Sequence, residues 1–165
     1  MQAAAAAGAP VVAPVPGSQC IFPASAGEAP TTGTFARTSG GYLLSRVGAR
    51  FAATTEGGVK VAFTALAALH ACGVYHGDAR TANLLVVDGQ AQWIDMRACM
   101  EEAEDGGALP LEQQQQRDAL HLARSLLFPH PLPPPVEKAL KLYNAADPGA
   151  VDALVREVCG GLVSF

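Results

Sequence analysis

The segment from Val59 to Cys72 constrains the fold most, because it is apolar on nearly every side of the helix that it predicts. Hydrophobic residues recur there at the spacing of helical turns, namely Val59, Ala62, Phe63, Leu66 and Leu69. Further alanines fill the other sides, and Lys60 and Thr64 interrupt them. A helix with this pattern is typically buried in the core of a domain. Gly73 follows the segment and predicts its end.

Length and composition support one modest domain. The chain has 165 residues, and half of them are hydrophobic, which is enough to form a core. Its formal net charge of −4 argues against a nucleic-acid binder that relies on a basic surface. No stretch is long and apolar enough to span a bilayer. We therefore expect neither a nucleic-acid nor a membrane partner.

The first forty residues differ in composition from the rest. Ala, Gly, Pro, Ser and Thr dominate residues 1–40, which predicts a low-complexity, disordered leader before a folded domain over 41–165. The prolines and the missing positive charge at the start match neither a secretory nor a transit signal, so a cytoplasmic location is the default expectation. The four cysteines lack zinc-site spacing and are expected to be reduced thiols, with Cys72 a small core residue.

A β-hairpin follows the apolar helix. Leu84 to Val87 predicts one strand, and Ala91 to Ile94 predicts the returning strand. Asp88-Gly89 between them favours a two-residue turn, because both central positions of such a turn need positive φ. The returning strand delivers Asp95 at its end.

The remaining pattern is mainly helical. Leu111 to Leu127 predicts a helix with Leu111 among the residues on its apolar side, and residues 136–144 and 151–158 predict two shorter helices. Pro129 to Pro135 predicts a rigid, non-helical bend. A short strand is expected at Tyr42 to Leu44. The fold class is therefore α+β, mostly α.

Three oxygen-bearing side chains lie around the hairpin in a pattern suited to phosphoryl transfer. Asp78 lies on the loop after the apolar helix, Asn83 follows five residues later, and Asp95 ends the hairpin. Because the hairpin reverses the chain, Asp95 returns beside the start of the first strand. Carboxylate and amide oxygens are ligands that Mg²⁺ prefers, and a carboxylate can accept the proton of an acceptor hydroxyl.

This stretch resembles the catalytic loop and metal-binding motif of the protein-kinase-like superfamily. His76-Gly77-Asp78 with Asn83 matches H-[RG]-D-x-x-x-x-N, in the HGD form of aminoglycoside and choline-type phosphotransferases and atypical kinases. Leu69-His70-x-x-Gly73 is similar to the end of the preceding helix. Gln116 to Leu120 is similar to the later helix whose Asp118 ties down the loop backbone, and Tyr42 to Ser45 weakly resembles the hinge strand. The resemblance covers about residues 42–128.

The resemblance implies a role for each matching residue. Asp78 would be the catalytic base, and Asn83 and Asp95 would bind magnesium. His76 would brace the catalytic loop, and Asp118 would support it. The implied fold is a protein-kinase-like C-terminal lobe whose small antiparallel hairpin carries the site. ATP and Mg²⁺ are the implied cofactors, and a hydroxyl-bearing protein or small molecule is the implied substrate.

The sequence also departs from the family pattern. A Gly-rich loop and a strand lysine of the small lobe are not recognisable, because the lysines stand at 60, 138 and 141. Asp95-Met96-Arg97 replaces Asp-Phe-Gly. Three readings therefore stay open: an active phosphotransferase, a truncated or pseudokinase binding module, and a fragment of a longer gene product. In the second reading, a protein partner would cover the exposed lobe interface.

Other interpretations of single residues also stay open. His70 is expected to be an ordinary packed or surface histidine, and the same is an alternative for His76. Asp118 could be a solvated helix carboxylate. Arg80 is expected to be a surface charge, with a substrate phosphate as its alternative partner. Gln113 to Gln116 is expected to be a polar helix start.

Overall fold

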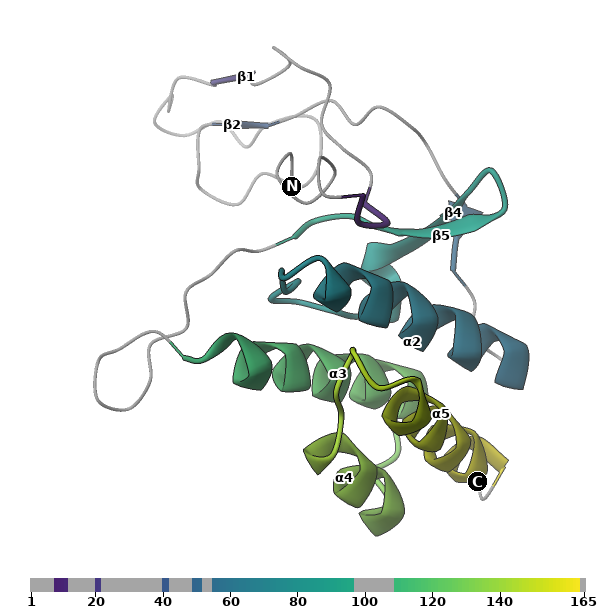
Figure 1. Cartoon of the computed structure of the whole chain (residues 1–165). Helices are drawn as coiled ribbons and strands as arrows, with labels where there is room; N and C mark the ends of the chain where they lie inside the picture. The colour runs from purple at the N-terminus through teal and green to yellow at the C-terminus, as the bar shows by residue number, and fades with distance from the viewer. Residues whose placement is uncertain are drawn as a thin grey trace, which may run out of the picture.

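The computed structural model describes residues 8–11, 20–21, 40–41, 49–51, 55–96 and 109–163. It confirms an α+β, mostly helical class with a small antiparallel sheet (Figure 1). The strands are β1 (Cys20–Ile21), β2 (Gly40–Gly41), β3 (Ala49–Arg50), β4 (Leu84–Val87) and β5 (Gln90–Trp93). The helices are α2 (Glu56–Ala71), the 3₁₀ turn η1 (Thr81–Asn83), α3 (Leu111–Leu127), α4 (Pro134–Lys141) and α5 (Pro148–Val163).

The predicted hairpin is present as β4 and β5. The two strands pair antiparallel, with Leu84 opposite Trp93. Asp88 and Gly89 form the turn with φ values of 52° and 77°, the positive values that the Asp-Gly pair predicts. A third strand, β3, pairs antiparallel with β4. This strand has two residues, which are too few to show an alternation of apolar and polar positions in the sequence.

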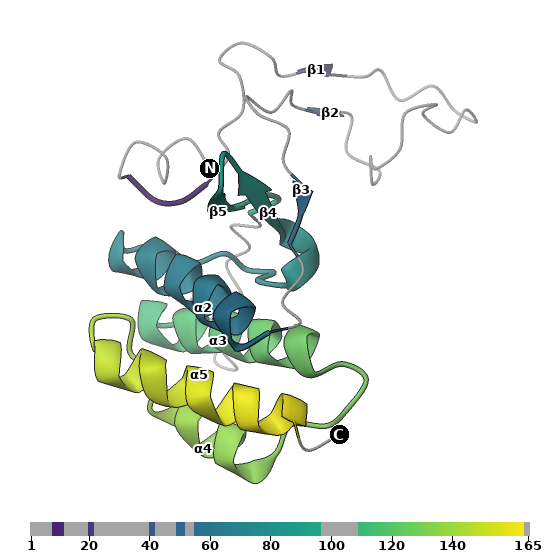
Figure 2. The same cartoon turned by 90° about the vertical axis from the view of Figure 1, so that its right-hand side faces the viewer.

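Helix α2 lies between the small sheet and the other helices (Figures 1 and 2). Val59, Phe63 and Leu66 are fully buried on it. The prediction of a core helix is therefore confirmed, but one side of it, with Val61 and Thr64, is exposed. The helix begins earlier than predicted, because the Thr55 hydroxyl caps it by accepting a hydrogen bond from the Gly58 N–H at 3.2 Å.

The end of α2 agrees with the sequence. Gly73 follows the helix with a φ of 73°, a conformation that glycine adopts without strain.

Helix α3 has the predicted bounds, whereas α4 and α5 begin earlier than predicted. On α3 the apolar side packs into the core, but Leu111 is 42% exposed and lies outside it. Helix α4 begins at Pro134, inside the bend predicted from Pro129 to Pro135, and α5 begins at Pro148, before its predicted start at 151. Proline is tolerated in the first helical turn because its missing N–H would have no intrahelical partner there.

A short N-terminal segment joins the core beside β5. Ala9 and Val11 are buried, and the Trp93 N–H donates a hydrogen bond to the Pro10 carbonyl at 2.7 Å. Most of the leader predicted over 1–40, and the strand and hinge predicted over 42–45, lie outside the described residues.

Two cysteine side chains lie at the edge of the core. Cys72 and Cys159 are half-buried thiols, and both pack against the edge of the core. Within the described ranges, no helix is long and apolar enough to cross a membrane.

Candidate active site

The loop between α2 and β4 is held at its start by α3. Asp118 of α3 is buried, with 1% of its surface exposed. Its carboxylate accepts hydrogen bonds from the backbone N–H groups of His76 and Gly77, and the bond from Gly77 is 2.9 Å long. These bonds fix the direction of the chain just before Asp78. The alternative reading of Asp118 as a solvated helix carboxylate is therefore wrong.

His76 links the loop to the end of the hairpin. Its ring is fully buried with its edge against Trp93, at 4.9 Å between ring centroids. Nδ1 accepts the Asp78 N–H at 3.2 Å, so Nε2 carries the proton and donates to the Ile94 carbonyl at 3.0 Å. Burial lowers the pKa of His76, against the raising effects of Asp118, the Ile94 carbonyl and two nearby aspartates. His76 is thus a neutral brace between loop and hairpin.

Asn83 closes the other end of the loop. Its amide nitrogen donates to the Asp78 backbone carbonyl at 2.9 Å and to the Asp78 carboxylate at 3.2 Å. The backbone carbonyl of Asn83 accepts a hydrogen bond from the Ile94 N–H at 2.9 Å, which continues the pairing of the hairpin strands. Asn83 is therefore tied both to the loop that precedes it and to the strand that leads to Asp95.

Asp95 lies on the same side of the hairpin as the loop. It stands two residues after Trp93, which pairs with Leu84, and it is exposed with a φ of 54°. The Ile94 N–H bonds to the backbone carbonyl of Asn83, so the next residue, Asp95, emerges beside the end of the loop. The fold brings Asp78, Asn83 and Asp95 to one end of the hairpin.

An ion pair that the sequence interpretation missed engages Asp78. Arg80 approaches it from two residues along the loop, with Nε at 2.8 Å from Oδ1 and Nη2 at 2.8 Å from Oδ2. The Asp78 side chain is 15% exposed and that of Arg80 is 51% exposed. The expectation of Arg80 as a surface charge is correct for its exposure, but its guanidinium engages both oxygens of Asp78.

A buried polar chain behind the loop was also missed. His70 lies between two partners, with Nδ1 at 2.9 Å from the Tyr143 hydroxyl and Nε2 at 3.2 Å from the Asp118 carboxylate. Burial, with a smaller contribution from Asp118, raises the pKa of Tyr143 well above its usual range. Tyr143, after α4, is thereby connected through His70 and Asp118 to the backbone that precedes Asp78.

Two further side chains of α3 hold the loop. The Gln115 amide donates to the carbonyls of His70 at 3.0 Å and Val74 at 3.2 Å. The Ser125 hydroxyl accepts the Thr81 N–H at 3.1 Å. The glutamine run is thus more than a polar helix start, because Gln115 secures the chain between α2 and the loop.

The donor set fits magnesium in chemical type. Asn83 and Asp95 offer amide and carboxylate oxygens, and Mg²⁺ commonly takes one or two such groups and completes its shell with water and phosphate oxygens. Because the Asn83 nitrogen bonds to Asp78, its amide oxygen is directed elsewhere. The described part of the chain has no group of three or more His, Cys, Asp or Glu side chains that could hold a metal ion.

Comparisons with known proteins do not add to these observations. No protein-family model matches the chain, and neither a curated protein nor a solved structure matches it.

Proposed function

We propose that this chain carries the catalytic-loop half of an ATP- and Mg²⁺-dependent phosphotransferase site of the protein-kinase-like class. The γ-phosphoryl group would pass to a hydroxyl acceptor. The observation that carries the proposal is the loop held by Asp118, which brings Asp78 and Asn83 to the end of the hairpin where Asp95 emerges. Phosphoryl transfer depends mainly on such positioning and on charge stabilisation.

Each of these residues has a chemical role in the proposed reaction. Asp78 orients the acceptor hydroxyl and takes its proton. Asn83 and Asp95 hold magnesium, which neutralises phosphate charge when bound. His76 and Asp118 touch no reactant, and they keep the loop and the hairpin in register.

A second candidate function is a binding module without turnover. The observation that favours it is the ion pair of Asp78 with Arg80, in which both carboxylate oxygens are engaged. A base held in this way has to exchange Arg80 for the acceptor before it can accept a proton. A protein that never makes this exchange would bind nucleotide and leave it intact.

Turnover of ATP in the presence of hydroxyl acceptors separates the two candidates. We expect phosphorylated product from the parent chain and a loss of roughly 100-fold or more in Asp78→Asn, because general base catalysis is removed. Asp88→Asn is the matched control, since Asp88 lies in the hairpin turn and asparagine also adopts positive φ. Equal turnover in parent and Asp78→Asn would contradict the phosphotransferase proposal. Nucleotide binding without any turnover would favour the binding module.

A further inference from the structure

A cavity of about 470 Å³ opens beside the candidate base. It lies between the catalytic loop and the C-terminal half of α3, and its lining includes Asp78, Arg80, His121, Arg124 and Phe128. Pockets of roughly 300–1,000 Å³ are the usual size for small-molecule ligands. A compound in this cavity would therefore have direct access to Asp78.

The cavity is cationic although the chain is acidic. Two guanidinium groups, on Arg80 and Arg124, face a single carboxylate, on Asp78, whereas the whole chain carries a net charge of −4. His121 adds ring nitrogens that can donate hydrogen bonds. Arginine binds carboxylate and phosphate groups through paired N–H donors. The lining therefore favours an anionic ligand.

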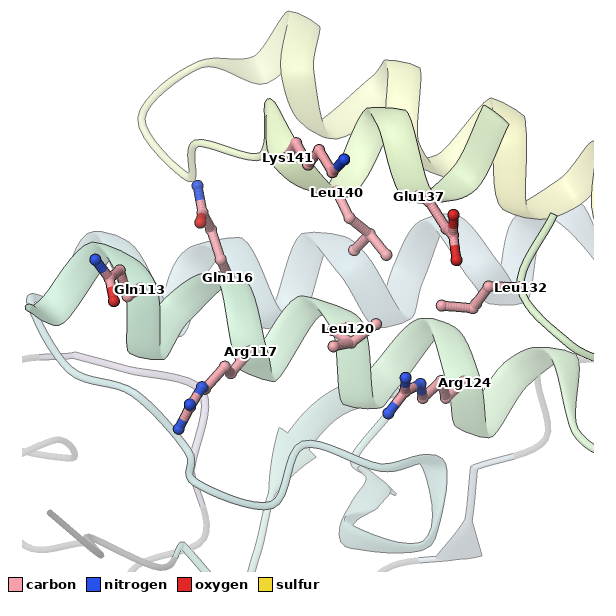
Figure 3. Close-up of a pocket in the computed structure, with 9 residues that line it drawn as sticks. All are labelled: Gln113, Gln116, Arg117, Leu120, Arg124, Leu132, Glu137, Leu140 and Lys141. Carbon is pink, nitrogen blue, oxygen red and sulfur yellow. The ribbon is translucent and has the colours of Figure 1, made fainter. Parts of the chain in front are cut away.

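Arg124 borders two cavities, one of which is the cavity beside Asp78. Helix α3 also borders a second cavity of about 590 Å³, shared with α4 and lined by Leu132 and Leu140 (Figure 3). Figure 3 shows Arg124 among the side chains of α3 that line this second cavity. Arg124 also lines the cavity beside Asp78, so its side chain is within reach of a ligand there.

The Ser125 hydroxyl in the cavity wall is already engaged. Ser125 accepts the Thr81 N–H and donates to the Leu122 carbonyl at 2.9 Å. These bonds fix the spacing between loop and helix. Phe128, which is 81% exposed at the end of α3, adds an apolar surface at the rim. Recognition of charge therefore falls to the arginines and His121.

Resting on the proposed function, we propose that this cavity is the acceptor site, and that the acceptor is a small hydroxyl compound bearing a carboxylate or phosphate group. Arg124 and His121 bind the anionic group, and the hydroxyl lies at Asp78. The anion also competes for Arg80, so acceptor binding draws the guanidinium away from Asp78. The base is then released only when the acceptor is present.

The transfer step is balanced with ATP as donor. The acceptor oxygen forms a bond to the γ-phosphorus, and the bond from that phosphorus to the bridging oxygen of ADP breaks. The hydroxyl proton passes to Asp78, and ADP leaves with the bonding electrons. Cationic acceptors, such as aminoglycosides or choline-like alcohols, are disfavoured because they would meet like charges on Arg80 and Arg124.

Calorimetric titration of the full chain without nucleotide tests the assignment. The probes are glycerol 3-phosphate and glycerate, compared with glycerol, choline and inorganic phosphate at low salt. We expect one or both anionic hydroxyl compounds to bind more tightly than the other three. Arg124→Gln should weaken this binding by about tenfold or more, because a charge-assisted contact is lost. His121→Gln should weaken it less, and Arg156→Gln, an exposed residue of α5 outside the cavity, should leave it unchanged.

Several results would overturn the inference. Glycerol, choline or inorganic phosphate could bind as tightly as the better of the two anionic hydroxyl compounds. The affinity could be equal in Arg124→Gln and the parent, or a cooperatively folded parent could bind no anion. Arg124→Lys keeps the charge and should retain part of the affinity, which separates charge loss from misfolding.

The titration tests the acceptor site, and a separate measurement of nucleotide binding tests the proposed function, so either proposal can fail without the other. Because no nucleotide is present, loss of anion binding overturns the acceptor site and leaves the phosphotransferase proposal standing. Arg124-dependent anion binding by a chain that does not bind Mg²⁺–ATP would contradict the proposed function and keep the anion site.

Discussion

Asp118 on α3 accepts a hydrogen bond from the Gly77 N–H at 2.9 Å, across 41 residues of sequence. The same carboxylate accepts the His76 N–H and contacts His70. One buried side chain thus determines the backbone path into Asp78. The proposed chemistry depends on this path more than on any contact of Asp78 itself, because phosphoryl transfer depends on position.

Removing the Asp118 carboxylate should destabilise the fold and misplace the loop. Asp118→Ala leaves two buried N–H groups and His70 without their partner, which should cost about 2–4 kcal/mol of unfolding free energy. Asp118→Asn keeps one acceptor oxygen and should cost less. Urea unfolding measures both. Asp152→Ala is the control, because its contact with Lys60 is an exposed ion pair worth little. Equal stability of Asp118→Ala and the control would contradict this account.

Tyr143 should contribute to stability through His70. Tyr143→Phe keeps the ring, which lies edge-on to His70 at 5.7 Å, and removes only the hydroxyl. The unpaired His70 nitrogen should then cost about 1 kcal/mol. A double-mutant cycle with His70→Leu measures the coupling. If the two changes are additive, the buried chain from Tyr143 to Asp118 is not an energetic unit.

Stability should fall as the pH decreases through the ordinary pKa of histidine. The folded pKa of His76 lies below the unfolded value of 6.5, because burial disfavours the charged ring. Below that value the unfolded chain binds a proton that the folded ring resists, so acid favours unfolding. Urea unfolding at pH 7.5 and 5.5 should show a larger loss of stability for the parent than for His76→Gln. Equal losses would mean that His76 is not held in its neutral form.

The parts of the fold that follow from local chemistry were predictable. Asp88-Gly89 determines its turn by its own backbone preferences, and the hairpin register then brings Asp95 beside the loop. The bounds of α3 follow from apolar residues that recur at helical spacing over a long segment. Strand β3 was not predictable, because its two residues are too few to show a pattern. The start of α4 at Pro134 was not predicted, because a proline in the first turn of a helix cannot be told from a proline in a connector by sequence alone.

Residue spacing alone predicts the candidate site only along the chain, whereas the contact of Asp118 with the loop was expected from the family resemblance and is present. The spacing of Asp78, Asn83 and Asp95 could be read directly, since one loop and one hairpin connect them. The pair of Asp78 with Arg80 depends on loop dihedrals that residue order does not determine. The contact of His70 with Tyr143 joins residues 73 apart. No local pattern encodes a partner at that distance.

The thermal unfolding midpoint of the parent chain and of Asp95→Asn, with and without Mg²⁺–ATP, tests the central claim most directly. Ligand at about a hundred times its dissociation constant should add about 2.7 kcal/mol of stability to the parent. The account predicts a clear upward shift that needs both magnesium and ATP and that is lost in Asp95→Asn. No shift in a cooperatively unfolding parent, or an equal shift in the variant, would contradict the claim that the end of this hairpin binds a metal nucleotide.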